Sequence, residues 1–187
     1  MNDQDLIWKE YSRKSCFNTK IFSVSEIESR SPKGEIRVFS AIESNDWAIV
    51  IPVIETEHGK EFVMVKQWRH GLGELSIEFP GGVIEQGESI ADGARRELRE
   101  ETSYDTKNIK LLASMSPNPA IMSNRVHFFL ATDLQPCGGQ ELDKDEFIEI
   151  LTQPVEYIIK NMGSPPYLHA LMAAALCCYT KNCDRVF

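Results

Sequence analysis

Four glutamates and three arginines are concentrated in the 14 residues from Glu88 to Glu101. The segment Ser89–Thr102 has no proline and offers leucine and alanine for packing, which predicts a helix. At about 100° per residue, Glu97, Glu100 and Glu101 fall within roughly a 100° arc on one face. Like charges at this spacing repel each other, and a bound divalent cation would reverse that effect. Carboxylate oxygens are hard ligands, so the pattern favours Mg²⁺ or Mn²⁺ over zinc.

The same residues have a second interpretation that needs no metal. Arg96 and Glu100 are four residues apart and would pair on an exposed helix. The segment could therefore be a solvated, salt-bridged surface helix, and the acidic face alone does not exclude this.

The full spacing resembles the signature of the Nudix hydrolases, G-x5-E-x7-R-E-U-x-E-E-x-G-U, in which U is aliphatic. Here Gly82 is followed after five residues by Glu88, and after seven more by the run Arg96–Glu101. Ser103 stands in place of the last glycine and Tyr104 in place of the last aliphatic residue. That glycine ends the helix, where φ is often positive, so a serine there would cost about 1 kcal/mol. The departure affects the local turn and no proposed ligand.

The resemblance implies roles for the residues of this motif. It assigns metal binding to Glu97, Glu100 and Glu101 and to the backbone carbonyl of Gly81. Glu100 and Arg96 also count as catalytic residues. Arg96 is expected to pair with the first motif glutamate, Glu88, and to orient the neighbouring carboxylates rather than touch substrate.

More of the chain resembles the ADP-ribose pyrophosphatase and nucleoside-diphosphate-sugar hydrolase branch of this family, from about Thr19 to the last helix. Four further segments carry this resemblance: Lys66–Arg69 looks like K-Q-[FY]-R, Ile77–Gly82 like E-x-P-A-G-G/L, Asp145–Glu149 like E-F-[IV]-E, and Pro119 lies 16 residues after Ser103, where the branch carries proline.

These segments supply candidate substrate contacts. Arg69 could place its guanidinium on a phosphate, or be a surface arginine. Glu78 could contact metal or water, or be a solvent-facing carboxylate at a strand end. Phe39 corresponds to an aromatic clamp that the branch presents across a swapped dimer, and Pro119 completes the substrate-binding set.

The general base is expected outside the motif, because the motif glutamates are occupied as ligands. The polar loop Leu134–Asp145 contains glycines and could close over substrate. Glu146 follows it and matches a base candidate of the branch. A solvated acidic loop is the alternative, and Asp145 or Glu78 could take the role instead.

The remaining elements predict an α+β protein, and the resemblance implies a Nudix-type α/β/α sandwich with a mixed sheet and an N-terminal β-hairpin extension. Pro52 suggests a bulge or an edge position in its strand. The expected strands are Trp47–Ile54, Glu61–Arg69, Leu75–Phe79, Ile109–Ser114, Arg125–Ala131 and Phe147–Thr152, and the expected later helices are Val155–Asn161 and Tyr167–Lys181.

Residues 1–45 are expected to form a separate region before a Nudix domain at 46–187. Two strand-like runs, Thr19–Ser25 and Glu35–Glu43, flank a turn signal and predict a hairpin. An isolated hairpin is only marginally stable, so it must pack on its own domain or on another subunit. The resemblance implies that it builds a homodimer.

Composition limits the possible partners and compartment. The formal net charge of −8 disfavours a broad nucleic-acid surface. The N-terminus has no apolar signal core, and the longest apolar run, Ala170–Tyr179, is too short to span a bilayer. Five cysteines without paired spacing favour a reduced, cytoplasmic protein.

The expected activity is Mg²⁺-dependent hydrolysis of the pyrophosphate bond of ADP-ribose or a related nucleoside-diphosphate sugar, giving a nucleoside monophosphate and a sugar phosphate. GDP-mannose and CDP-alcohol pyrophosphatases remain alternatives, as does a non-catalytic ADP-ribose sensor. The intact glutamate set argues against the sensor, because a pure binder has no need to cluster like charges.

Overall fold

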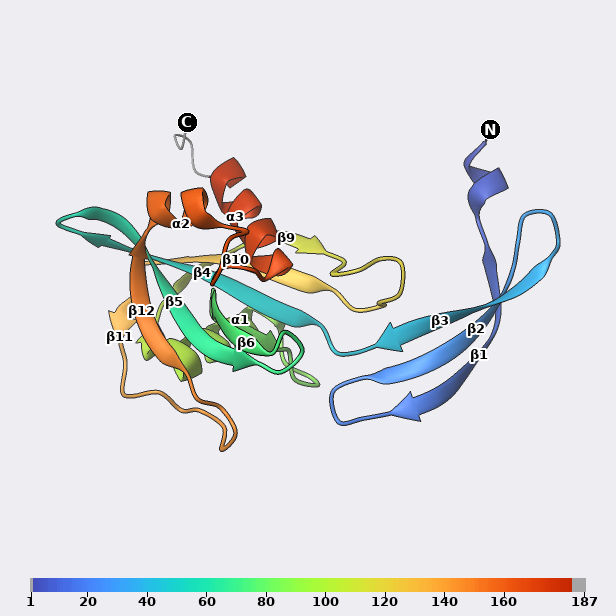
Figure 1. Ribbon diagram of the computed structural model, residues 1–187, viewed down its shortest axis with the longest axis horizontal. Coiled ribbons are helices and arrows are strands. Elements are labelled where there is room, and N and C mark those ends of the chain that lie inside the picture. Colours follow the sequence, from blue (N-terminus) through green and yellow to red (C-terminus); the bar gives the residue numbers. More distant parts are fainter. Residues whose placement is uncertain (1, 183–187) are drawn as a thin grey trace. The chain divides into compact units, whose positions relative to one another are not determined.

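The structure, a computed structural model, describes residues 2–182 and divides into two units (Figure 1). The first unit comprises the described residues up to Asn45 together with Ser116–Arg125, and the second comprises Asp46–Met115 and the described residues from Val126 onward. The elements in chain order are η1 (Asp3–Leu6), β1 (Lys9–Asn18), β2 (Ser23–Arg30), β3 (Ile36–Glu43), β4 (Trp47–Thr56), β5 (Gly59–Arg69), β6 (Glu74–Glu78), β7 (Gly81–Val83), α1 (Ile90–Thr102), β8 (Tyr104–Asp105), β9 (Asn108–Met115), β10 (Val126–Thr132), β11 (Gln135–Pro136), β12 (Glu149–Pro154), α2 (Val155–Asn161) and α3 (Ala170–Asn182).

The first unit is a three-stranded antiparallel sheet in the order β1-β2-β3. Strands β2 and β3 form the expected hairpin, paired from Arg30↔Ile36 to Ser23↔Glu43. The expected start at Thr19 is wrong, because Thr19 forms a turn in which its hydroxyl accepts from Phe22 N. Strand β1 was not predicted, and the reason is its pattern: all ten of its residues are exposed, so no alternation of buried and exposed positions marks it.

Residues 116–125 group with the first unit, whereas the sequence assigned them to the second. Ile42 N donates to Ile121 O at 2.7 Å, and Ser123 N donates to Ile42 O at 3.1 Å. These two hydrogen bonds tie the segment to the end of β3.

The second unit is built on a seven-stranded mixed sheet with the main order β12-β5-β4-β10-β9; β6 pairs with β5 and β7 with β4. Strand β10 runs parallel to β4, and the other pairs are antiparallel. Pro52 therefore lies in a central strand, so the expectation of an edge position is wrong. It sits between Trp47–Ile49, which pairs with β7, and Val53–Thr56, which pairs with β5, at a break in the ladder where a missing N–H is tolerated.

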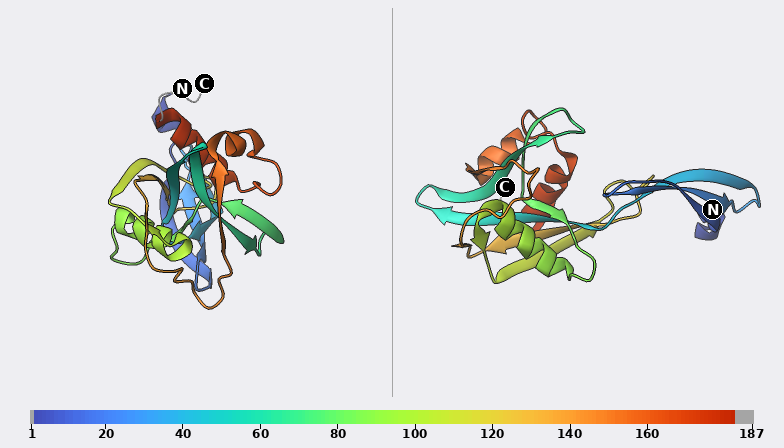
Figure 2. Two further views of the ribbon diagram at one scale, coloured as in Figure 1. Left: turned by 90° about the vertical axis from the view of Figure 1, so that its left-hand side faces the viewer. Right: turned by 90° about the horizontal axis from the view of Figure 1, so that it is seen from below.

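Helices cover both faces of this sheet, so the α/β/α sandwich is confirmed (Figures 1 and 2). Along β4, Ile49 and Ile51 pack in one core cluster with Leu176 and Ile158 of α3 and α2. Ala48 and Val50, on the opposite face, pack in a second cluster with Ala94 and Leu98 of α1. The alternation of β4 thus sends successive side chains into two cores.

Two elements begin later in the structure than the sequence predicted, and each difference has a local cause. The last strand begins at Glu149 rather than Phe147, whose side chain is 84% exposed. The last helix begins at Ala170 rather than Tyr167, because Tyr167 N donates to Ser164 O in a preceding turn. Among residues 2–182, no helix combines the length and apolar character needed to cross a membrane.

Candidate active site

Helix α1 positions the acidic motif and is capped at both ends. At its start, the Ser89 hydroxyl accepts from Asp92 N at 3.1 Å. At its end, Ser103 adopts the left-handed conformation (φ 60°), and its N–H donates to Arg99 O at 2.9 Å. The expectation of a positive φ at this position is therefore confirmed, although the residue is a serine.

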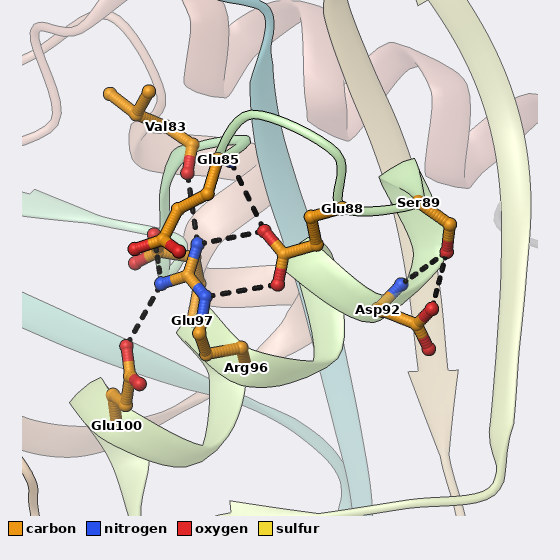
Figure 3. A network of polar contacts seen from close by, with 8 residues as sticks. All are labelled: Val83, Glu85, Glu88, Ser89, Asp92, Arg96, Glu97 and Glu100. Carbon is orange, nitrogen blue, oxygen red and sulfur yellow. Dashed lines mark hydrogen bonds and ion pairs between the residues drawn. The ribbon is translucent and has the colours of Figure 1, made fainter.

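Arg96 is the centre of the polar network on this helix (Figure 3). Its Nε and Nη2 donate to the two carboxylate oxygens of Glu88, both at 3.1 Å, as the motif predicts. Its Nη1 donates to Glu97 Oε1 at 2.8 Å and to Glu100 Oε2 at 3.0 Å. Nη2 also donates to the Val83 carbonyl at 3.0 Å. One guanidinium therefore joins three motif carboxylates to the strand that precedes the helix.

The glycine turn before α1 meets the other motif carboxylate. Glu101, only 4% exposed, accepts from Gly81 N at 2.9 Å. A methyl group on Gly81 would lie 2.1 Å from the Ala48 carbonyl oxygen, and one on Gly82 would lie 2.7 Å from the Glu97 carboxylate. Glycine is required at Gly81, where the clash is with backbone, whereas a side chain at Gly82 would push the Glu97 carboxylate away from the turn.

Burial changes the protonation of two of these carboxyls. Burial raises the pKa of Glu97 to about 7 against the opposing pull of Arg96. Burial likewise raises the pKa of Glu101 to about 8, against the stabilising Gly81 N–H. Repulsion from Glu146 adds to both increases in pKa. The interpretation as a solvated surface helix is therefore wrong, although the Arg96–Glu100 pair on which it rested does form.

The donor chemistry of this cluster fits a hard divalent cation. Glu97, Glu100 and Glu101 offer oxygen ligands only, and two of them are held in surroundings that disfavour their charge. Across residues 2–182, no group of three or more acidic, histidine or cysteine side chains is already gathered as a metal site. The reason is visible in the contacts: Arg96 holds Glu97 and Glu100, while Glu101 is turned to Gly81.

Arg69, whose side chain is 41% exposed, forms an ion pair with the buried Glu78 that the sequence did not indicate. Arg69 Nε and Nη2 donate to Glu78 at 3.0 and 2.7 Å, and His169 Nδ1 lies 2.9 Å from Glu78 Oε2. The Glu78 side chain is only 1% exposed, so the solvent-facing alternative is wrong. Burial alone would raise the pKa of Glu78, but hydrogen bonds from His169 and Arg69 lower it to about 2. Two of the N–H donors of Arg69 are thus bound to Glu78.

A cavity of about 640 Å³ lies beside these residues. Its walls include Trp68, Arg69, Gly82, His169 and Leu171. It therefore joins the glycine turn of the acidic motif to the Arg69–Glu78–His169 cluster, and its lining is largely apolar with a few charged groups, as in small-molecule sites. His169 could not be predicted from the sequence, because its contact with Glu78 spans 91 positions and corresponds to no motif spacing.

Glu146 lies on an exposed loop between β11 and β12. Its Oε2 accepts from Asp143 N at 3.1 Å, and its charge acts on the titration of Glu97 and Glu101. Asp145 is exposed in the same loop. The Glu146 carboxylate therefore interacts electrostatically with the motif, and Gln140 of the same loop donates from Nε2 to the Glu101 backbone carbonyl at 2.6 Å.

Phe39 and Pro119 belong to the first unit, apart from the other candidates. Phe39, in β3, is 46% exposed and meets Trp8 edge to face, with ring centroids 5.2 Å apart. Pro119 is exposed in the segment tied to β3. The second unit thus brings together Arg69, Glu78, Gly81 and the motif glutamates, whereas Phe39 and Pro119 belong to the first unit.

Comparison with known proteins agrees with this geometry. Residues 45–168 match the NUDIX domain, which covers about two thirds of the chain. The protein belongs to the Nudix family and is a Nudix hydrolase.

The similarity to several named proteins covers most of the chain. An ADP-ribose pyrophosphatase of Bacillus subtilis is 30% identical over 169 residues, 90% of each chain. ADP compounds hydrolase NudE of Escherichia coli is 24% identical over 159 residues, 84% of this chain and 83% of that protein. A mouse (Mus musculus) ADP-sugar pyrophosphatase is 31% identical over 146 residues, 71% of this chain and 67% of that protein.

The fold also matches a solved structure. The crystal structure of an ADP compounds hydrolase superposes with a TM-score of 0.81 and 20% sequence identity, covering 93% of this chain and 92% of that one. At this identity the likeness concerns the fold, which is the mixed sheet between helices described above.

Proposed function

We propose that the protein hydrolyses the pyrophosphate bond of ADP-ribose or a related nucleoside-diphosphate sugar in the presence of Mg²⁺, with Mn²⁺ as a substitute. The products are a nucleoside monophosphate and a sugar phosphate. The observation that carries the proposal is the packing of Glu97 and Glu101 against the Gly81-Gly82 turn, which forms one wall of the cavity that Arg69 lines. The names of the relatives support ADP compounds as the substrate class.

The motif residues divide the work on the substrate. Glu97, Glu100 and Glu101, with the Gly81 carbonyl, would hold the divalent cation, which neutralises phosphate charge and increases the acidity of water. Arg96 keeps Glu97 and Glu100 on one side of the helix through its Nη1. Glu88 fixes Arg96 through two hydrogen bonds. This chain of contacts orients the ligand carboxylates before substrate arrives.

Two residues outside the motif would bind the substrate phosphate and activate the attacking water. Arg69 has its Nε and Nη2 on Glu78, so Nη1 is the end that would reach a phosphate oxygen. Glu146 would accept the proton of the attacking water, because it is a carboxylate outside the ligand set whose charge already acts on Glu97 and Glu101.

We propose a homodimer in which Phe39 and Pro119 contact substrate. The first unit carries exposed apolar side chains at Tyr11, Phe17 and Val38, each more than half exposed. No residue of its described part belongs to the buried apolar core. A sheet that exposes large apolar side chains and has no core of its own gains stability by pairing with another surface.

A substrate panel tests the proposed activity. The purified protein is incubated with ADP-ribose, other ADP-sugars, GDP-mannose and a CDP-alcohol, each with and without Mg²⁺, and products are separated by chromatography. The expected result is AMP and ribose phosphate from ADP-ribose, only with the metal. Exclusive turnover of GDP-mannose or the CDP-alcohol would reject the ADP assignment. Tight ADP-ribose binding without turnover would show a sensor instead.

A further inference from the structure

The Glu78 carboxylate has three donors drawn from separate parts of the chain. Arg69, at the end of β5, supplies two N–H groups, and His169, directly before α3, supplies Nδ1. Because the buried Glu78 is ionised and accepts, the Nδ1 of His169 carries the hydrogen. His169 therefore fixes one carboxylate oxygen that Arg69 also uses, Oε2.

The segment before and within α3 supports the end of β6 at three consecutive residues. Ile77 N donates to the Pro166 carbonyl at 3.1 Å, and Phe79 N lies 3.0 Å from Met172 Sδ. The His169 contact to Glu78 lies between these two. The NUDIX match ends at residue 168, one residue before His169.

The orientation of Arg69 depends on this support. Two of its donors are committed to Glu78, and within the described part of the chain its Nη1 makes no hydrogen bond. A planar guanidinium held at two points has its third donor group fixed in direction. Arg69 and His169 both line the cavity of about 640 Å³, together with Gly82 of the motif turn.

We propose that His169 is a positioning residue for substrate: it holds Glu78 in the orientation that aims Arg69 Nη1 at a phosphate oxygen of the bound nucleoside-diphosphate compound. This inference rests on the proposed function for the nature of the ligand. His169 acts through Glu78 and Arg69 and takes no part in the bond-breaking step. Its loss should weaken substrate binding and leave the rate constant of the bound complex nearly unchanged.

Two substitutions of His169 distinguish its hydrogen bond to Glu78 from the contribution of its side chain to packing. His169→Leu removes the donor to Glu78, whereas His169→Asn retains an N–H near the position of Nδ1. Steady-state kinetics with ADP-ribose and Mg²⁺ should give a KM about tenfold higher for His169→Leu, the size expected for one hydrogen bond to a charged group, with kcat changed less than about twofold. His169→Asn should stay within about twofold of wild type in both constants. If His169→Leu does not fold, His169→Ala makes the same test.

A double-mutant cycle shows whether the effect passes through Arg69. In an Arg69→Ala background, His169→Leu should raise KM no further, because the group that it positions is gone. An undiminished tenfold effect in that background, or an unchanged KM in the single variant, would overturn the proposal.

A readout without substrate distinguishes this inference from the proposed function. In ¹⁵N-arginine-labelled protein, the Arg69 Nε–H resonance is assigned by its loss in Arg69→Lys. Its exchange with solvent should be slow in wild type and His169→Asn and faster in His169→Leu. If no nucleotide sugar is hydrolysed but this pattern holds, the proposed activity fails and the positioning stands. Equal exchange in all three proteins would reject the positioning.

Discussion

Glu101 is the most deeply buried of the motif glutamates, and its carboxylate accepts a hydrogen bond from the backbone N–H of Gly81. We expect Glu101→Gln to lower kcat at least a hundredfold, because it removes one negative charge from the proposed metal site while keeping the side-chain shape. Stability should change little, since the amide replaces a carboxyl whose pKa burial already raises to about 8. Turnover of ADP-ribose and thermal unfolding measure the two effects.

Glu156→Gln, an exposed site on α2, is the control for the charge change. It should retain wild-type turnover. Near wild-type activity of Glu101→Gln at low Mg²⁺ would remove this glutamate from the mechanism.

Glu146 is the residue whose role depends most on the loop that bears it. We expect Glu146→Gln to lower kcat while substrate and metal affinities stay close to wild type, because a base acts on the proton and not on binding. Turnover measured from pH 6 to 9, with metal affinity from calorimetry, makes the test. Asp145→Asn, one residue earlier in the loop, tests the alternative base and should retain wild-type kcat. An unchanged kcat across this pH range would leave the loop as a lid without a base.

At the scale of the element, helix α1 ends on a residue that is poorly suited to its conformation. Ser103 has φ 60°, which costs an L-residue about 1 kcal/mol relative to glycine. We expect Ser103→Gly to raise the free energy of unfolding by about 1 kcal/mol, measured by urea titration. Ser103→Ala keeps the strained backbone and should show no such gain. Equal stability of the two variants would mean that the turn is not strained.

Strand β6 ends with Glu78, a buried carboxylate whose ionisation stabilises the fold. The pKa of Glu78 is about 2 in the folded protein, below its ordinary value of 4.5. Its contribution to stability is therefore present above about pH 4.5 and is lost as pH falls through 2. We expect the wild type to lose about 3 kcal/mol more of its unfolding free energy between pH 5 and pH 2 than Glu78→Gln does. The free energy of unfolding is measured by urea titration at each pH. An equal loss in the two proteins between pH 5 and pH 2 would contradict this.

At the scale of the whole molecule, the three-stranded sheet exposes apolar side chains that need a partner. Every residue of β1 is exposed, and Ile21 and Tyr11 are 71% and 67% exposed. We expect deletion of Met1–Ser44 to abolish dimerisation and substrate binding together, as measured by sedimentation velocity and calorimetry. The point variant Tyr11→Glu, which leaves the chain intact, should weaken the dimer in the same direction. A fully active monomer after the deletion would refute the shared site.

The sequence alone determined those features whose signal is local. The hydrophobic runs of β4, β5 and β10 and the helix of the acidic motif follow from periodicity and were predicted to within two residues. The family resemblance implied the pairing of Arg96 with Glu88, and the positive φ of Ser103 follows from its place after the last turn of the helix. Local backbone geometry converts such spacings directly into contacts.

Only the tertiary structure decided what depends on distant segments meeting. Strand β1 has no buried face to mark it. Pro52 lies in a central strand because β10 pairs with one edge of β4 while β7 and β5 pair with the other. For Arg69 and Glu78 the sequence left both a site role and a surface position open; packing buried the Glu78 side chain to 1% exposure and left that of Arg69 at 41%. His169 joins them across 91 positions, and no periodicity records such a contact, because burial and long-range hydrogen bonds depend on how the elements pack together and not on neighbours in the chain.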